Sequence, residues 1–413
     1  MIGSSQQSLP EANVTRVVFN NVNLFDGQSA PRSGHHVTVE GNRIIATGKG
    51  PGAIQTGDRV IDLAGKTLMP GMWIGHYHGH AVMPGAPAYL TLQAAKIARD
   101  TLMSGFTSVI SAGSIGYVEP SLAKAIDEGM YPGPRILPGS RDVSGTGNNI
   151  DILTPWYQQV KSDFDIRCCD GADAFRHAVR DEVKRGAKII KLLITGGHGA
   201  FVEKGRMEMS GDELRAAIDT AHERGVLIRG HLAGRDAVLL SVELGLDIVD
   251  HGDDMDEECI AAMVERGTSL APSCGFPKVW LERDNSAPSD FNRADLDHML
   301  NILPAANEAG VNIVLGDDYF IWFTPADEME VYVNDAGIAP LDVMRWATSN
   351  GAKAARRDHD LGTIEVGKLA DLLVIDGDPT QDIAVFKDPD RTLVVMKDGA
   401  FVKDELARVL PEH

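Results

Sequence analysis

The chain has 413 residues, of which 43% are hydrophobic, so it is long enough to bury a large core and to form two domains. Aspartate and glutamate number 59 against 39 lysine and arginine residues, which gives a formal net charge of -20. This charge repels nucleic acid and anionic membrane surfaces, so we expect neither as a partner.

The cysteines and the amino-terminal residues indicate the cellular compartment in which the protein is expected. The four cysteines stand at positions 168, 169, 259 and 274, and none forms the CxxC pair of a zinc knuckle or redox motif. The first residues, MIGSSQQSLPEANVTR, lack the basic start and the apolar stretch of a secretory signal. No apolar run approaches the ~20 residues of a membrane span. We therefore expect a cytoplasmic protein with free thiols.

Short alternating strands are predicted at the two ends of the chain. Residues 14–69 contain VVFNNVNLFDG, HHVTVEGNRIIATG and RVIDLAGKTLMPG, which alternate apolar and polar residues and break at turn residues. The same pattern returns in residues 361–408 with LADLLVIDGD and RTLVVMKDGAFVKD. We expect the two end segments to pair into one small β-sandwich domain.

Between the ends, residues 70–360 alternate strand-like and helical patterns. The strand-like runs are GFTSVIS, PRILPG, AKIIKLLIT, VLIRGHL, DIVDHG, TSLAPS and VNIVLGDD. Helical patterns such as GDELRAAIDTAHERG, GRDAVLLSVELG and DEECIAAMVERG separate them. Strands that are apolar on both faces and joined by single helices predict a parallel sheet, and about eight repeats favour a closed barrel over an open Rossmann sheet.

A pair of histidines follows the first apolar run of this region. His76 and His78 are separated by one residue, and the two-residue period of a strand sends both imidazoles to one face and Tyr77 to the other. Two convergent neutral imidazoles form half of a metal site. An HxH pair alone occurs in many chains without a metal, so the prediction depends on its partners.

Further ionisable residues end later predicted strands, where a barrel places its active groups: Lys191, His231, His251 and Asp318. A lysine in an apolar strand either extends its amine to solvent or is an expensive buried charge. Burial favours the neutral amine, which reacts with carbon dioxide to give a carbamate able to bridge two cations. From these residues alone, both interpretations of Lys191 stay open.

Six motifs occur in the order and spacing of the amidohydrolase superfamily: PGMWIGHYHGH, GFTSV, GAKIIKLLITGG, GHLAG, DIVDHG and VLGDD. The chain resembles this superfamily over nearly its whole length, including LGTIEVGKLADLLVIDGDP near the carboxyl end. It looks most like the branch of prolidase-like Xaa-Pro dipeptidases, arginine carboxypeptidase-like enzymes and ochratoxin amidohydrolase. The resemblance implies an α/β fold, a (β/α)8 TIM barrel with a small β-sandwich domain.

The resemblance also implies two divalent metal ions, expected to be zinc, and a carboxylated Lys191 that bridges them. It assigns the more buried ion to His76, His78 and Asp318, and the second ion to His231 and His251.

The implied mechanism is hydrolytic. A hydroxide held between the ions would attack the scissile carbonyl, because a bound divalent cation lowers the pKa of water and polarises the carbonyl oxygen. Asp318 would take the proton of that hydroxide and deliver it to the leaving amine.

The sequence departs from the family pattern at three positions. Position 74, often an aspartate on the same face as the first histidine, is Ile74, which removes a plausible hydrogen-bond acceptor for a metal ligand and predicts weaker metal binding. Position 111, often an aspartate, is Ser111, and the second histidine of the usual HAHG is Ala233. We expect these three positions to shape the substrate pocket.

Other residues near the predicted mouth of the barrel are weaker candidates. His80 and His198 are candidates for contact with substrate or the developing oxyanion, although loop histidines are more often simply solvated. Tyr319, with Trp322 and Phe323, is a candidate wall of an apolar substrate pocket, with packing against the helices as the equal alternative.

Asp317 directly precedes Asp318. Because a strand sends neighbouring side chains to opposite faces, we expect Asp317 to have a structural role or to support a metal ligand.

The predicted function is hydrolysis of an amide or peptide-like C–N bond in a small molecule, such as a dipeptide, an N-acyl amino acid or a xenobiotic amide. The first alternative is a deaminase or other cyclic-amide hydrolase of the same superfamily. The strand lysine, Lys191, disfavours a deaminase. The second alternative is a non-enzymatic scaffold, which the filled ligand positions disfavour. A homo-oligomer is expected by analogy alone.

Overall fold

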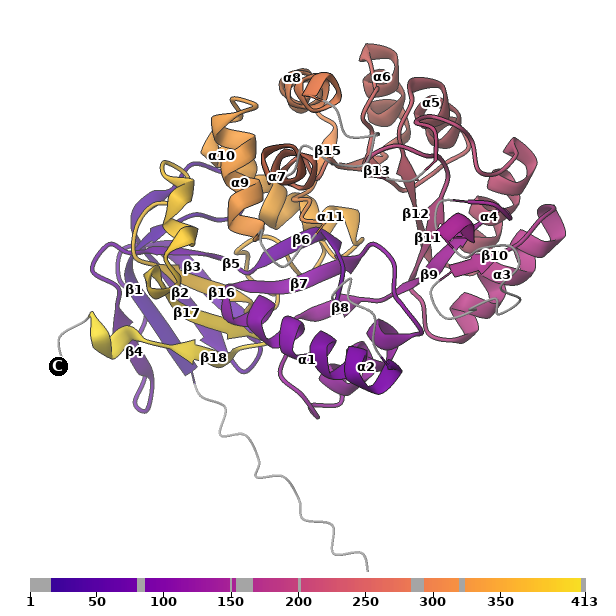
Figure 1. Cartoon of the computed structure of the whole chain (residues 1–413). Helices are drawn as coiled ribbons and strands as arrows, with labels where there is room; N and C mark the ends of the chain where they lie inside the picture. Colours follow the sequence, from indigo (N-terminus) through magenta and orange to yellow (C-terminus); the bar gives the residue numbers. More distant parts are fainter. Residues whose placement is uncertain are drawn as a thin grey trace, which may run out of the picture.

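A computed structural model of the chain describes residues 16–79, 86–148, 151–153, 166–199, 202–283, 293–318 and 324–409. In Figure 1 the indigo and yellow ends of the chain lie together in one β domain, and the segment between them forms a barrel of strands with helices outside. The predicted α/β class, a (β/α)8 barrel with a β domain built from both chain ends, is confirmed.

The β domain is an eight-stranded sheet with the order β18-β17-β16-β5-β1-β2-β3, in which β4 also pairs with β1. Its strands are β1 (Arg16–Leu24), β2 (Arg32–Glu40), β3 (Arg43–Lys49), β4 (Arg59–Asp62), β5 (Thr67–Pro70), β16 (Leu372–Ile375), β17 (Thr392–Lys397) and β18 (Ala400–Asp404). The two chain ends meet where β5 pairs antiparallel with β16, with Met69 opposite Leu373. Alternating apolar residues of both ends, such as Phe19, Val37 and Val394, fill one core.

The barrel strands are β6 (Met72–Tyr77), β7 (Phe106–Ser111), β8 (Arg135–Leu137), β9 (Gly139–Ser144), β11 (Ile189–Leu193), β12 (Leu227–Leu232), β13 (Ile248–His251), β14 (Ser269–Ala271) and β15 (Asn312–Ile313). Their pairings are parallel, and β8 and β9 continue one another across Pro138. The barrel closes where the amide of Gly75 donates to the carbonyl of Leu315 over 2.7 Å. The short β10 (Ile166–Cys168) pairs with β9.

Two strands differ from the sequence prediction. The run VNIVLGDD contributes only two residues to a paired strand, β15. In contrast, β9 was not predicted, because its residues Ser140, Arg141 and Asp142 do not read as an apolar strand. Arg141 is buried, and its guanidinium pairs with the buried Glu182 over 2.6 Å.

Apolar side chains fill the barrel interior below the site. Trp73, Ile110, Ile189, Leu227 and Ile248 form one buried cluster there. The alternate positions, such as Ile190 and Ile228, point outward and pack against the helices. This alternation places the charged residues near the carboxyl ends of the strands inside the barrel.

The barrel helices are α1 (Pro87–Met103), α2 (Val118–Asp127), α3 (Ala172–Lys184), α4 (Gly211–Glu223), α5 (Arg235–Glu243), α6 (Glu257–Arg266), α7 (Gly275–Arg283), α8 (Arg293–Ala309), α9 (Pro325–Asn334), α10 (Pro340–Arg345) and α11 (Gly351–Ala354). The three helical patterns named above correspond to α4, α5 and α6. Ser210 and Glu213 form a capping box that starts α4, and Gly267 ends α6 in a left-handed conformation. None of the helices in the described ranges is long and apolar enough to cross a membrane.

Candidate metal centre

The predicted ligands meet at the carboxyl ends of the barrel strands. His76 lies in β6 and His78 just after it, His231 lies in β12, His251 ends β13, and Asp318 follows β15. One ligand atom each from His76, His251 and Asp318 lie within 4.8 Å of one another. These three residues therefore form a candidate metal site.

His78 extends this cluster. Its Nε2 lies 3.2 Å from Nε2 of His76 and 3.2 Å from Oδ1 of Asp318. Nε2 of His76 lies 3.5 Å from the same carboxylate oxygen. The two imidazoles converge as the HxH spacing predicts, and Tyr77 points to the other side, where it lines a cavity with residues of α1.

The prediction that Ile74 lies on the same face as His76 is wrong. The pairing of β6 with β7 is irregular between Ile74 and Tyr77, as at a β-bulge, so strict alternation does not hold there. Ile74 packs outward, in the cluster between the barrel and the helices, whereas His76 points inward. Ile74 is therefore not beside the candidate ligands, and another residue supplies the acceptor: Oδ1 of Asp250 lies 3.2 Å from Nδ1 of His76.

Left-handed backbone turns orient three of the site residues. His198, His251 and Asp318 have φ values of 48°, 71° and 49°, a region that residues other than glycine rarely adopt. At the end of β13, this turn brings His251 into the site although the preceding Asp250 already points inward. Such strained conformations tend to cluster at functional sites.

His231 and Lys191 complete the set of predicted ligands. The ring of His231 lies 4.6 Å from that of His251, and its Nε2 is 2.9 Å from the carbonyl of Gly197. Lys191 is 3% exposed, and its Nζ donates to Oδ2 of Asp250 over 2.6 Å. The amine of Lys191 is therefore buried and does not extend to solvent.

Electrostatics favour neutral imidazoles in this cluster. Burial lowers the pKa of His76 despite the nearby Asp250 and Asp318. Burial and the Lys191 cation lower the pKa of His231 to about 4. Burial, together with His198, lowers the pKa of His251 well below its usual value. Each of these rings therefore keeps a lone pair for a metal ion at neutral pH.

Asp318 supplies negative charge to the cluster. Burial opposes ionisation of its carboxyl group, but His76 and His78 outweigh this effect and hold the pKa of Asp318 well below its usual range. Nδ1 of His251 is buried and has no hydrogen-bond partner in the part of the chain that the structure describes. Neutral imidazoles, a carboxylate and a buried unpaired ring nitrogen fit a divalent transition metal.

His198 also lies in this cluster. Its ring stacks on His251 with 3.6 Å between centroids, and its Nε2 is 3.9 Å from Oδ2 of Asp318. Burial lowers the pKa of His198, but Asp253, whose Oδ1 is 2.9 Å from Nδ1, outweighs this effect and raises it. The supporting Asp253 was not predicted. The other candidates, His80, Tyr319, Trp322 and Phe323, lie outside the described residues.

Asp317 faces away from the cluster, as predicted. It lines a separate cavity of about 440 Å³ on the outer side of the barrel, beside α1 and the start of α9. Burial and the nearby Glu328 raise the pKa of Asp317 well above its usual value, and its Oδ1 has no partner within the described ranges. Two adjacent aspartates thus have opposite surroundings.

The two other departures from the family pattern lie in buried positions. The hydroxyl of Ser111 accepts a hydrogen bond from the amide of Gly113 over 3.2 Å. Ala233 is fully buried beside Gly197, and its amide donates to Thr195 over 2.8 Å.

A pair of opposite charges in the barrel was missed by the sequence reasoning. Arg229 in β12 and Asp250 in β13 are both fully buried and ion-paired. The available signal was a charged residue directly after apolar ones in each of two runs, Arg229 in VLIRGHL and Asp250 in DIVDHG, because a buried charge needs a partner of opposite charge.

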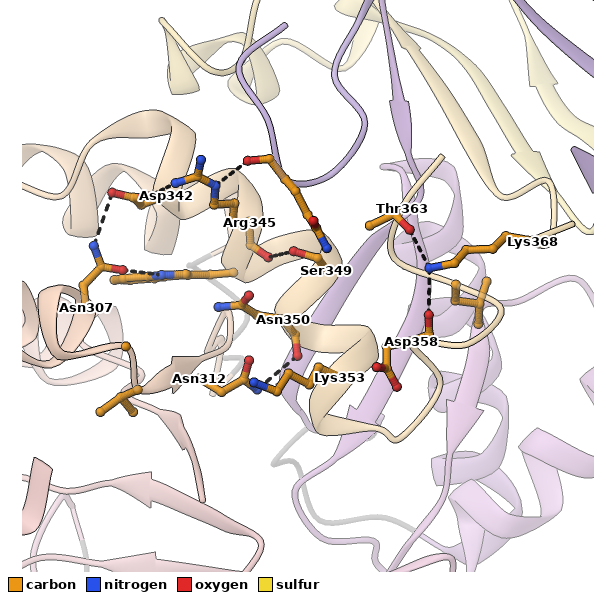
Figure 2. Close-up of a pocket in the computed structure, with 15 residues that line it drawn as sticks. Asn307, Asn312, Asp342, Arg345, Ser349, Asn350, Lys353, Asp358, Thr363 and Lys368 are labelled. Atoms are coloured by element: carbon orange, nitrogen blue, oxygen red, sulfur yellow. Dashed lines mark hydrogen bonds and ion pairs between the residues drawn. The ribbon is translucent and has the colours of Figure 1, made fainter. Parts of the chain in front are cut away.

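The cavity in Figure 2 lies at the opposite end of the barrel. It has a volume of about 740 Å³ and is lined by Asn312 at the start of β15 and by residues of the π-helix Trp346–Asn350. Several side chains that line it bond to one another: Asn307 donates to Asp342 and accepts from the indole N–H of Trp346. None of the predicted site residues lines it.

The fold and the site together define the class, a (β/α)8-barrel protein with a candidate histidine–aspartate metal centre at the mouth of the barrel. The sequence pattern of the amidohydrolase family matches residues 67–402. The chain therefore belongs to the amidohydrolase family.

Individual relatives are similar over most of the chain. Ochratoxinase from Aspergillus niger is 26% identical over 365 residues, which cover 81% of this chain and 75% of the relative. The crystal structure of a Xaa-Pro dipeptidase with bound methionine is 27% identical, has a TM-score of 0.83, and covers 94% of this chain and 100% of its own. The crystal structure of a prolidase complexed with N-methylphosphonate-L-proline is also 27% identical. It has a TM-score of 0.84 and covers 94% of this chain and 100% of its own. The resemblance predicted from the motifs is confirmed.

Proposed function

We propose that the chain hydrolyses an amide or peptide-like C–N bond in a small substrate and uses two divalent metal ions, with zinc as the expected metal. The observation that carries this proposal is the convergence of neutral imidazoles, an ionised Asp318 and the buried Lys191 at the mouth of the barrel. When bound, the metal ions would lower the pKa of a water molecule and polarise the substrate carbonyl.

The ligands divide between the two ions as the family resemblance implies. Lys191 would bridge the ions as a carbamate, and the remaining ligands would be His76, His78 and Asp318 for one ion and His231 and His251 for the other. The close contacts among His76, His78, His251 and Asp318 support one compact donor set.

Carboxylation of Lys191 fits its surroundings. An ammonium group beside two divalent cations would be repelled by both, whereas a carbamate has the opposite sign. The carbamate nitrogen keeps one N–H, which can still donate to Asp250, the present partner of Nζ.

Asp318 is the proposed proton carrier. Its carboxylate is ionised and therefore able to accept the proton of the attacking water. The same carboxylate would then release the proton to the leaving nitrogen, which makes the amine a good leaving group. Asp317 is excluded from this role because it faces the outer cavity.

His198 is proposed to contact the substrate. Asp253 holds its Nδ1, so the opposite edge of the ring faces Asp318. The raised pKa favours a ring that donates a hydrogen bond to the oxygen of the scissile carbonyl as negative charge develops there.

The substrate class is proposed from the relatives, which include an ochratoxinase and a Xaa-Pro dipeptidase. The test is to assay purified, metal-loaded protein against N-acyl amino acids, dipeptides including Xaa-Pro, and aryl amides, with cyclic amides and amino-heterocycles as the competing classes. We expect turnover of at least one linear amide. Turnover confined to the competing classes would contradict the proposal.

Metal content tests the two-ion part separately. Elemental analysis is expected to find two transition-metal ions per chain in active protein. A fully active preparation with a single ion per chain would contradict the bridged pair and favour a deaminase-like enzyme.

A further inference from the structure

A fully buried guanidinium lies directly below the candidate metal centre. Arg229 donates from Nη1 to the carbonyl of Gly75 over 2.8 Å and to that of Ser111 over 2.9 Å. Its Nε lies 3.1 Å from both carboxylate oxygens of Asp250, and its Nη2 makes a closer contact with the same group. One side chain of β12 thus contacts β6, β7 and β13 at the level where their carboxyl ends carry the site.

Asp250 connects this guanidinium to two predicted metal ligands. Its Oδ1 is 3.2 Å from Nδ1 of His76, and its Oδ2 accepts from Nζ of Lys191. The carboxylate is therefore an acceptor for both residues.

The acceptor at Nδ1 decides which nitrogen of His76 is available to a metal. Nε2 of His76 faces His78 and Asp318, whereas Nδ1 faces Asp250. A carboxylate at Nδ1 keeps the proton on that nitrogen and leaves the lone pair on Nε2, toward the site. The opposite tautomer would place a hydrogen on Nε2 and block it.

Arg229 also contacts the imidazole ring of His76 directly. Its Nη2 lies 3.4 Å from Nδ1 of His76, and a guanidinium can only donate. Without the carboxylate of Asp250, this donor would favour an unprotonated Nδ1 and therefore the blocked tautomer. The ion pair keeps Arg229 directed at Asp250 and at the carbonyls of the neighbouring strands.

We propose that Arg229 and Asp250 are a positioning pair that sets the tautomer and direction of His76 and thereby raises the affinity of the site for a divalent metal. This inference rests on the proposed function, because it concerns the metal centre named there. Neither residue is proposed to touch the substrate.

The test measures the affinity for Zn²⁺ by competition with a chelator, on full-length protein. Changing the partner of a metal-binding histidine typically weakens affinity by about 10–100-fold, and we expect this loss for Asp250→Asn and for Arg229→Met. Arg229→Lys keeps the charge but not the fork of donors, so it should recover part of the loss. The absorption spectrum of bound Co²⁺ should change in the same variants.

A second buried arginine provides the matched control. Arg141 is 3% exposed and pairs with the fully buried Glu182, and this pair joins β9 to α3 and includes none of the candidate ligands. Arg141→Met should lower the thermal stability, as any unpaired buried carboxylate does, and keep wild-type affinity for Zn²⁺. This control separates loss of a buried ion pair from loss of metal positioning.

The outcomes distinguish this inference from the proposed function. Wild-type affinity in Asp250→Asn, or equal losses in Arg229→Met and Arg141→Met, would overturn the positioning role. If Arg229→Met does not fold, Asp250→Asn, which is nearly the same size and shape as the native residue, decides alone. Absence of Zn²⁺ binding by the unchanged protein would instead overturn the proposed function.

Discussion

At the two ends of the barrel, His231 and His222 have pKa values that are shifted in opposite directions. At the carboxyl ends of the strands, burial and Lys191 lower the pKa of His231 to about 4. At the amino end of β13, a hydrogen bond to Asp247, with 3.0 Å between the heavy atoms, raises the pKa of His222. A neutral ring can bind a metal ion, whereas a protonated ring is a partner for a carboxylate. The same residue type thus indicates chemistry at one end and structural support at the other.

The polar groups of the two ends differ in the same way. At the amino end, the cavity in Figure 2 is lined by side chains that bond to one another, such as Asn307 with Trp346 and Asp342 with Arg345. At the mouth, the ring nitrogens of His76 and His78 point toward each other and toward the negatively charged carboxylate of Asp318. Substitutions at the mouth should therefore change activity, and those at the amino end should change stability.

The largest effect is expected at Asp318. Asp318→Asn should keep the fold but lower turnover by about 100-fold or more, because an amide cannot carry the proton that a carboxylate carries. Steady-state kinetics on the best substrate measures this loss. Asp317→Asn is the matched control and should cost much less, since Asp317 faces the outer cavity. Reversed effects would show that the proton carrier has been misassigned.

Lys191 tests whether the mouth contains a carbamate. Lys191→Ala should lose the bridge and most activity, whereas Lys191→Glu should retain part of the metal because its carboxylate has the right charge. Short carboxylic acids should partly rescue the alanine variant. Electron density at position 191 in metal-loaded crystals is the direct measurement. An unmodified lysine in fully active protein would contradict the bridge.

Asn307 tests the structural end of the comparison. Asn307→Ala removes the acceptor for the indole N–H of the buried Trp346, 3.1 Å away, and should lower the free energy of unfolding by about 1–3 kcal/mol. Denaturant titration measures this change. The kcat should stay at the wild-type value, and a marked fall in kcat at unchanged metal content would argue against separate roles for the two ends.

The smallest effect is expected for the ion pair of His222 with Asp247. Because folding raises the pKa of His222 above its ordinary value of 6.5, the stabilisation is fully present below that pH. It is lost as the pH rises through the higher pKa of the folded state. Melting temperatures of wild type and His222→Gln, compared between about pH 5 and pH 8, should differ most at the acid end. A difference that grows toward alkaline pH would contradict this sign.

The sequence alone determined the barrel, the paired chain ends and the positions of the predicted ligands. These features are local: apolar runs of strand length, helical spacing between them, and ionisable residues where the runs end. His76 and His78 were predicted to converge, and Asp317 and Asp318 to diverge, from the two-residue period of a strand. The geometry brings these residues together, and their roles as ligands stay predictions.

Only the tertiary structure decided how neighbouring strands meet. Strict alternation placed Ile74 beside His76, but an irregularity in β6 turns Ile74 outward. Left-handed turns at His251 and Asp318 orient both residues into the site, and single-residue conformations of this kind leave no periodic signal. The pairing of Arg229 with Asp250 depends on the register of β12 against β13, which sets Arg229 opposite Ile248 and His231 opposite Asp250. Arg229 and Asp250 pair because both side chains are fully buried, where an unpaired charge is costly.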